Sequence, residues 1–269
     1  MQKRILIVSQ DLFPYTQEGT VGEEILNLAK MIKQNKGIEV RLFMPKYGCV
    51  NERRHQLHEV IRLSGVNIVV NDIDQPLIVK VASIPQARLQ VYFIDNDEYF
   101  QRKLVLTEKN KSLIPDNDER MIFFSRGVLE TLQMLGWSPD IIHCNGWFTS
   151  LLPVYLKTLY SKYPVFEQTK VISSFNKKLG MKGTLDKALI DKMKFDGINE
   201  DDVDFLKRPN CENLYKAAAK FSDGIILEDN YKNPSILDAL YKQGRPILDS
   251  EEHAEYYNFY QNFFSEELV

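Results

Sequence analysis

The sequence predicts an α/β fold built on a mostly parallel β-sheet. Two observations carry this prediction: apolar runs rich in β-branched residues recur along the 269 residues, and amphipathic helical patterns separate them. Strands that alternate with helices favour a parallel sheet that is covered on both faces and joined by right-handed crossovers. We therefore expect one Rossmann-like domain over residues 1–269, with no internal repeat and no linker.

The first strand–helix–strand unit is expected at the start of the chain. The apolar run at 5–8 predicts a buried strand, and a second strand is expected at 40–44. Between them, apolar residues at i, i+3, i+4 and i+7 mark one face of an amphipathic helix; these residues are Ile25, Leu28, Ala29 and Ile32.

The loop before this helix is ambiguous as an anion site. Free N–H groups and the helix dipole at a helix N-terminus favour negative charge. This loop, however, carries Glu18, Glu23 and Glu24 and contains no Lys or Arg. The scaffold is typical of a phosphate site, whereas its charge disfavours a phosphate.

The later elements continue the α/β pattern. Two β-rich runs, 77–84 and 89–94, predict a hairpin at an edge of the sheet. A long helix is expected at 117–135, with Gly136 as its C-terminal cap. The charged segment 177–194 is expected to be an exposed loop or a loosely packed helix. Further strands are expected at 140–144, 171–175 and 224–227, with helical patterns at 148–159 and 214–221.

Composition and charge limit the possible functions. Hydrophobic residues make up 44% and charged residues 26% of the chain, as in globular proteins with a substantial core. A net charge of −3 provides no basic surface for nucleic acid. The first apolar run is too short for a signal-peptide core, and no run reaches membrane-spanning length, so we expect a cytoplasmic protein.

The cysteine and histidine residues do not form a metal-binding pattern. Cys49, Cys144 and Cys211 are widely spaced and belong to no CxxC motif, so neither a disulfide framework nor a zinc site is expected. The four histidines show no ligand spacing either. We predict no metal and no cofactor.

A series of motifs extends over most of the chain. The most specific is the run from Asp116 to Arg126, an Asp-Asn-acid-Glu-Arg sequence followed by two phenylalanines and an arginine. The others are 5–9 leading to Gly22, 44–48, 93–100, 136–144, and Trp147 with 153–156. Together they resemble the N-terminal half, the starch synthase catalytic domain, of the glycogen and starch synthase family.

The resemblance implies a fold and a role. It implies that the chain is related to two-domain glucosyltransferases, which move glucose from a nucleotide sugar to an α-1,4-glucan. Their cleft lies between two Rossmann-like domains, and the second domain holds most of the nucleotide. By this resemblance the chain corresponds to the acceptor-side domain standing alone.

The chain departs from the family pattern in its first loop. The family loop resembles Lys-Thr-Gly-Gly-Leu-Gly, in which the lysine contacts the phosphates and the glycines admit the substrate. Gln17 stands at the lysine position, whereas Gly19 and Gly22 remain. Loss of a charge-assisted contact of this kind costs about 1.5–3 kcal/mol.

Two strand ends also depart from the family pattern. A motif similar to His-x-His-Asp-Trp keeps His143 and Trp147 but has Asn145 and Gly146 at its middle pair. A motif similar to Thr-Ile-His-Asn has Phe175 in place of the imidazole, and Phe175 cannot donate a hydrogen bond. No catalytic residue is therefore assigned, because the expected positions are altered at Gln17, Asn145 and Phe175.

The retained residues are candidates for ligand binding. Each also has a structural interpretation: His143 as a hydrogen-bonded histidine at a strand end, and Trp147 as a packing residue. The candidates are Gly19, Gly22, His143, Trp147 and Asn176.

An aromatic helix is expected at about 251–268. Tyr256, Phe259, Tyr260 and Phe263 share one helix face, which indicates a terminal helix docked on the domain; the alternative is a surface for a partner. The resemblance implies the first, because the last helix of such transferases often packs back on the first domain.

These observations lead to one functional hypothesis and two alternatives. The hypothesis is a synthase-like protein, inactive alone, that binds an α-glucan, a nucleotide sugar or a partner protein of glycogen metabolism. The first alternative is the acceptor-side subunit of a split glucosyltransferase completed by a separate donor-domain chain. The second is an unrelated small-molecule-binding domain of Rossmann-like fold.

Overall fold

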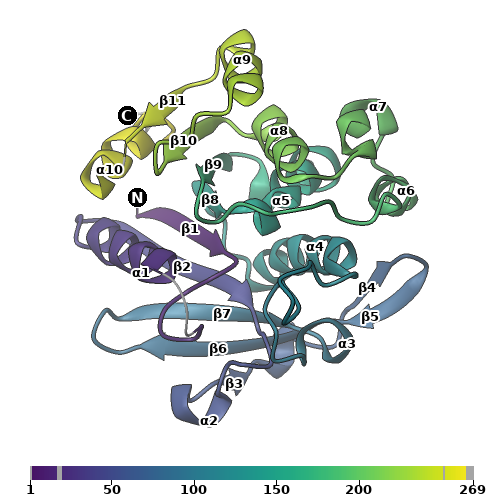
Figure 1. Ribbon diagram of the computed structural model, residues 1–269. Helices are drawn as coiled ribbons and strands as arrows, with labels where there is room; N and C mark the ends of the chain where they lie inside the picture. Colours follow the sequence, from purple (N-terminus) through teal and green to yellow (C-terminus); the bar gives the residue numbers. More distant parts are fainter. Residues whose placement is uncertain (1, 17–19, 251, 265–269) are drawn as a thin grey trace.

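The computed structural model describes residues 2–16, 20–250 and 252–264 (Figure 1). In this part of the chain a nine-stranded sheet has the order β11-β10-β9-β8-β1-β2-β7-β6-β3, and β4 and β5 form a separate two-stranded sheet. Every pairing from β11 to β7 is parallel. The predicted α/β fold with a mostly parallel sheet is confirmed.

The parallel part of the sheet contains every strand that was expected to be parallel. Its strands are β1 (Lys3–Ser9), β2 (Ile38–Pro45), β7 (Leu89–Asp95), β8 (Ile141–Asn145), β9 (Lys170–Asn176), β10 (Gly224–Glu228) and β11 (Ile247–Asp249). Residues 5–8 of β1 are completely buried, because the strand is covered on both faces.

An antiparallel edge completes the sheet. β6 (Ile78–Ile84) pairs antiparallel with β7, as the predicted hairpin requires, and β3 (His58–Glu59) pairs antiparallel with β6. The small hairpin of β4 (Asn67–Val70) and β5 (Ile73–Pro76) was not predicted.

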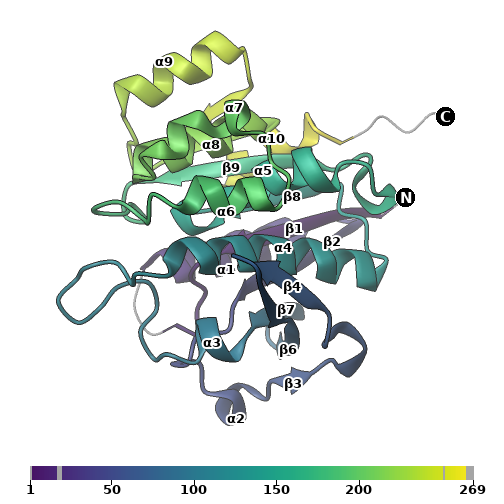
Figure 2. The same ribbon diagram turned by 90° about the vertical axis from the view of Figure 1, so that its right-hand side faces the viewer.

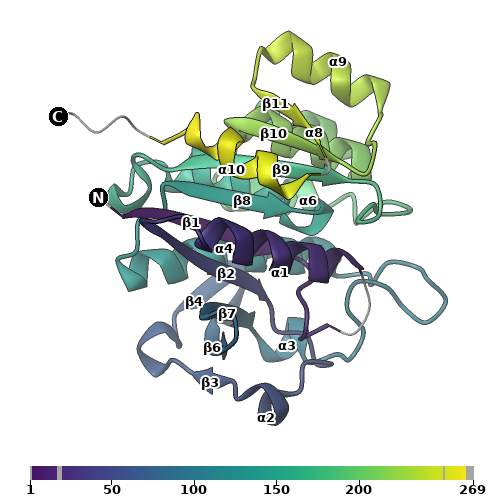
Figure 3. The same ribbon diagram turned by 90° about the vertical axis from the view of Figure 1, so that its left-hand side faces the viewer.

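Helices cover both faces of the sheet. Figure 3 shows α1 (Thr20–Lys33) and α10 (His253–Gln261) in front of one face, and these two helices contact each other. Figure 2 shows the opposite face, which is covered by α4 (Asn117–Leu135), α5 (Leu151–Tyr155), α6 (Leu189–Phe195) and α8 (Cys211–Phe221). The remaining helices are α2 (Glu52–His55), α3 (Asp97–Phe100), α7 (Glu200–Val203) and α9 (Pro234–Gln243).

Two helical segments differ from the sequence predictions. The helix expected at 148–159 is divided into a 3₁₀ turn at Trp147–Thr149, α5, and a π-helical turn at Leu156–Tyr160. Pro153 contributes to this irregularity, because it offers no N–H group to the helix. The segment 177–194 is not simply loose, because α6 buries Leu189 and Met193.

The long helix α4 agrees with its prediction at both ends. It ends at Leu135, and Gly136 takes the left-handed conformation with φ of 59°. Its N-terminal acid Asp118 is completely buried and pairs with Lys192 of α6 at 2.6 Å. No helix in the described ranges is both long and apolar enough to cross a membrane.

Candidate functional site

The strand order places the candidate site at one edge of the sheet. β1 has β2 on one side and β8 on the other, so the strand order reverses between β1 and β8. Ligands of open α/β sheets bind outside the carboxyl ends of the strands at such a reversal. Here Ser9 pairs with Asn145, and the segments that follow these two residues form the edge.

His143 lies inside β8 and not at this edge. Its side chain is completely buried, and its two ring nitrogens are 2.6 Å from the hydroxyls of Ser174 and Tyr260. Burial, helped by the nearby His253, lowers the pKa of His143 to about 3. The imidazole is therefore neutral, and it donates through one nitrogen and accepts through the other.

Asn145 is the polar side chain at the end of β8. Its amide nitrogen makes long hydrogen bonds to the carbonyl oxygens of His143 (3.4 Å) and Val8 (3.5 Å). Its Oδ1 is buried and has no hydrogen-bond partner among the described residues. Asn145 is thus held inside the fold and does not extend to the surface.

Gly146 makes room for the side chain of Gln10. Its φ is 82°, and a Cβ at this position would lie 2.5 Å from Oε1 of Gln10. That oxygen accepts a hydrogen bond from the backbone N–H of Phe148 at 3.1 Å. Gln10 therefore occupies the space into which a side chain at position 146 would extend.

Phe175 and Asn176 end β9. The Phe175 ring is completely buried and stacks on Tyr215, with a centroid distance of 4.4 Å. The Asn176 side chain donates to Glu228 Oε2 at 2.9 Å and accepts from the backbone N–H of Lys178 at 2.7 Å. Phe175 thus belongs to the core, whereas Asn176 lines a cavity.

The other candidates lie near the same edge. Gly22 is in the first turn of α1, and a Cβ there would lie 2.9 Å from the backbone nitrogen of Phe13. Trp147 is buried and packs edge-to-face against Phe148. Gln17 and Gly19 lie outside the described residues.

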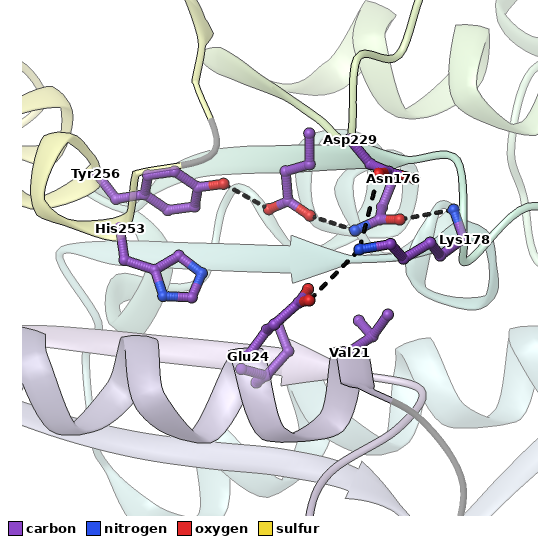
Figure 4. Close-up of a pocket in the computed structure, with 9 residues that line it drawn as sticks. Val21, Glu24, Asn176, Lys178, Asp229, His253 and Tyr256 are labelled. Atoms are coloured by element: carbon purple, nitrogen blue, oxygen red, sulfur yellow. Dashed lines mark hydrogen bonds and ion pairs between the residues drawn. The ribbon is translucent and has the colours of Figure 1, made fainter.

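The first cavity, which we call the β10 pocket, lies between the ends of β9 and β10, α1 and α10. Its volume is about 170 Å³, and Figure 4 shows its side chains. Tyr256 of α10 donates to Glu228 Oε1 at 3.0 Å. Lys178 lies between Glu24 (3.5 Å) and Asp229 (3.7 Å), and Glu24 raises its pKa.

The second cavity, which we call the β1 pocket, lies where the strand order reverses. Its volume is about 500 Å³. Gln10 and Asp11, which follow β1, form one wall, and a loop after α3 forms another. The two ends of that loop are joined by an ion pair between Arg102 and Asp116. The other residues that line the β1 pocket are Thr16, Cys49, Lys103, Leu104, Val105, Thr107, Glu108 and Leu179.

Both pockets have more acidic than basic side chains in the part of the chain that the structure describes. The β10 pocket has Glu24, Glu228 and Asp229 with Lys178. In the β1 pocket the charged side chains are Asp11, Glu108 and Lys103. Carboxylates repel phosphates but accept hydrogen bonds from hydroxyl groups, so both pockets favour neutral polar ligands over a diphosphate.

Sequence reasoning missed three important side chains. Gln10 and Asp11 were read only as the polar residues that end an apolar run. Their position after the first strand of an α/β unit could have indicated a ligand site, because ligands bind at the carboxyl ends of such strands. Tyr260 was recognised as part of an aromatic helix face, but its bond to a histidine more than a hundred residues earlier has no local signal.

Comparison with known proteins gives the family. The model of the starch synthase catalytic domain matches residues 4–244. Glycogen synthase of Chlorobium limicola is 39% identical over 170 residues, which are 63% of this chain and 35% of that protein. Glycogen synthase of Chlorobaculum parvum is 32% identical over 227 residues, which are 82% of this chain and 44% of that protein.

A solved structure agrees with the sequence matches. The catalytic domain of starch synthase IV from Arabidopsis thaliana, bound to ADP and acarbose, superposes with a TM-score of 0.73 at 20% identity, covering 93% of this chain and 52% of that chain. This likeness shows the fold. From the extent of the family match, the chain belongs to the starch synthase catalytic domain family.

Proposed function

We propose that this chain binds α-glucan at the carboxyl edge of its sheet and does not transfer glucose by itself. The proposal treats residues 1–269 as one domain similar to the N-terminal half of a glycogen or starch synthase. The relatives that it matches are glycogen synthases, and the chain covers 35% of the length of the first of them.

The observation that carries the proposal is the state of the altered motif positions. In the motifs that this chain resembles, the three positions carry an imidazole, a carboxylate and a second imidazole. This chain has Asn145, Gly146 and Phe175 at these positions, in that order. Asn145 and Phe175 are buried, and Gln10 fills the space beside Gly146. None of these three residues supplies an acid, a base or a charged hydrogen-bond donor to a reacting sugar.

His143 does not replace the missing groups. Both of its nitrogens are already bonded to hydroxyls, and its low pKa keeps it neutral. Opening it to a substrate requires removal of Tyr260, which is itself completely buried. We therefore assign His143 a structural role.

Two further observations support a glucan as the ligand. The starch synthase with the same fold is bound to ADP and acarbose. In this chain the acidic pockets disfavour the diphosphate of a nucleotide sugar but suit the hydroxyl groups of a glucan. A glucan is thus the better match of the two substrates of the family.

Calorimetry with the purified chain tests the proposal. We expect maltoheptaose to bind and ADP-glucose and UDP-glucose to give no heat of binding under the same conditions. The proposal fails if either nucleotide sugar binds more tightly than maltoheptaose, or if maltoheptaose does not bind.

A split glucosyltransferase is the second candidate. It is favoured by the β1 pocket, which remains open at the reversal of strand order although the motif beside it is altered. Isolation of the chain from its native extract, followed by a transfer assay with any chain that accompanies it, tests this candidate. Activity that requires both chains supports it.

The alternative of an unrelated Rossmann-like binder is excluded by the family membership.

A further inference from the structure

A third cavity, which we call the hairpin pocket, lies between α2, the loop after β1 and the turn that joins β6 to β7. Figure 1 shows α2 beside β3, at the antiparallel edge of the sheet. Ile84, in one wall of the pocket, pairs with Leu89 at the start of β7, whereas the carboxyl edge lies at Asp95, about 20 Å further along that strand. The described residues that line the hairpin pocket include none from the β1 or the β10 pocket.

The charge of the hairpin pocket is opposite to that of the other two. Its volume is about 370 Å³, and no carboxylate is found among the described residues that line it. Arg54 and His55 are its basic groups. The other lining residues are Pro14, Tyr15, Gln56, Ser83, Ile84, Pro85 and Gln86. This pocket therefore favours an anion, whereas the other two disfavour one.

The nearest acid of α2 does not cancel this charge. Glu52, in the first turn of α2, is paired with Lys46 at 2.7 Å and with Lys80 at 2.8 Å. Two ammonium groups thus compensate this carboxylate, and Arg54 has no ion-pair partner in the part of the chain that the structure describes. A guanidinium without a partner can donate two parallel hydrogen bonds to a phosphate.

The backbone of α2 fixes the place of the two basic groups. Asn51 Oδ1 accepts a hydrogen bond from the Arg54 N–H at 2.9 Å, and Gln56 ends the helix in the left-handed conformation with φ of 52°. The His55 ring packs edge-to-face on Tyr15 with a centroid distance of 4.9 Å. Burial and the positive charge of Arg54 lower the pKa of His55, so the two basic groups act on the same small space.

The remaining walls suit a small body that carries hydroxyl groups. Pro14, Ile84 and Pro85 provide apolar surface, and Ser83 and Gln86 provide hydrogen-bond donors and acceptors. The volume lies in the range of small-molecule sites. A phosphorylated sugar has both parts of the matching chemistry, since its phosphate suits the basic groups and its hydroxyls suit the amide and the serine.

We propose that the hairpin pocket binds a small phosphorylated sugar, with its phosphate on Arg54 and His55 and its hydroxyls against Ser83 and Gln86. This inference goes beyond the proposed function, because it concerns a second site and a different ligand. A nucleotide sugar carries its phosphates between two sugars and presents no terminal phosphate, so the inference does not require ADP-glucose or UDP-glucose to bind.

Calorimetric titration of the whole chain with ribose 5-phosphate, ribose and inorganic phosphate at low salt tests the inference. We expect ribose 5-phosphate to bind, inorganic phosphate to bind about tenfold more weakly, and ribose to give no heat of binding. Arg54→Gln should weaken the binding of ribose 5-phosphate at least about tenfold. Arg53→Gln is the matched control, because Arg53 is the exposed neighbour on α2 that does not line the pocket; its affinity should stay within about twofold of wild type.

A second variant tests the location of the site. Ser83 is an exposed residue of β6, so Ser83→Trp should fold, fill the hairpin pocket and abolish the binding of ribose 5-phosphate. Unchanged affinity in Ser83→Trp would overturn the inference, as would a wild-type chain that does not bind ribose 5-phosphate.

Two further results would also overturn it. Equal losses in Arg53→Gln and Arg54→Gln would mean attraction to a charged surface and not to a pocket. Inorganic phosphate that binds as tightly as ribose 5-phosphate would contradict the assignment of a phosphorylated sugar. None of these results bears on glucan binding, which the titration with maltoheptaose tests separately.

Discussion

The two pockets at the carboxyl edge differ in how completely their polar groups are bonded to one another. In the β10 pocket Glu228 accepts from Asn176 and Tyr256, and Lys178 lies between two carboxylates. In the β1 pocket Asp11 keeps a buried oxygen without a partner in the described structure. The polar groups of the β1 pocket, which is the larger of the two, are thus less completely hydrogen-bonded than those of the β10 pocket.

This difference indicates a division of roles. Buried polar groups that bond one another stabilise a fold. The bonds of the β10 pocket connect α10 to β10. The β1 pocket has no equivalent set of bonds across it among the described residues, and its volume of about 500 Å³, against about 170 Å³ for the β10 pocket, leaves more room for a ligand.

Restoring an acid beside the β1 pocket should produce the largest effect. Gly146→Asp forces a side chain at positive φ against Gln10, so we predict a loss of about 3 kcal/mol in the free energy of unfolding, measured with urea. Gly65→Asp is the control, because Gly65 also has positive φ but no atom within 4 Å of its Cβ position. Equal losses in the two variants would contradict the account of Gln10.

Removing the hydroxyl that bonds His143 should produce the next largest effect. Tyr260→Phe leaves one nitrogen of a completely buried imidazole without its partner, so we predict a loss of about 1–3 kcal/mol. Tyr163→Phe removes the same atom from a ring that is 46% exposed and should change stability by less than about 0.5 kcal/mol. A stable Tyr260→Phe variant would show that the bond contributes little.

Neutralising the Asp11 carboxylate should have a smaller effect, and it should raise the free energy of unfolding instead of lowering it. Its folded-state pKa of about 6 lies above the unfolded value of 3.8, so its favourable contribution is complete below the unfolded pKa and is lost as the pH rises through 6. Asp11→Asn should therefore raise stability at pH 7.5 by about 1 kcal/mol, after allowance for partial exposure, with no gain below about pH 4. A variant that is less stable than wild type at pH 7.5 contradicts this sign.

The ion pairs of Lys178 should have the smallest effect. The side chain is 47% exposed, so Lys178→Met should cost less than about 0.5 kcal/mol in thermal unfolding at moderate salt. A larger loss would mean that these ion pairs, and not the bonds of Tyr256 and Tyr260, are important for holding the β10 pocket together.

Local patterns were sufficient to predict most of the fold. The apolar stripe of α1 and the glycine cap of α4 are encoded within a few residues, and both are confirmed. The hairpin of β4 and β5 and the short strand β11 were missed, since each strand has only three or four residues and little periodicity.

The site could be predicted only in part, because its contacts join distant segments. The altered motif positions are visible in the sequence, but the bond of Tyr260 to His143 spans 117 residues and Gln10 reaches Phe148 across 138. The partners of the charged residues of α4 are likewise distant in sequence: Asp118 pairs with Lys192 and Arg126 with Asp196, both outside α4.

A glucose-transfer assay tests the central claim most directly. The purified chain is incubated with glycogen and labelled ADP-glucose or UDP-glucose, alongside the glycogen synthase of Chlorobium limicola as a positive control. Our account predicts incorporation of label by the control and none above background by this chain. Sustained incorporation by the purified chain alone would contradict it.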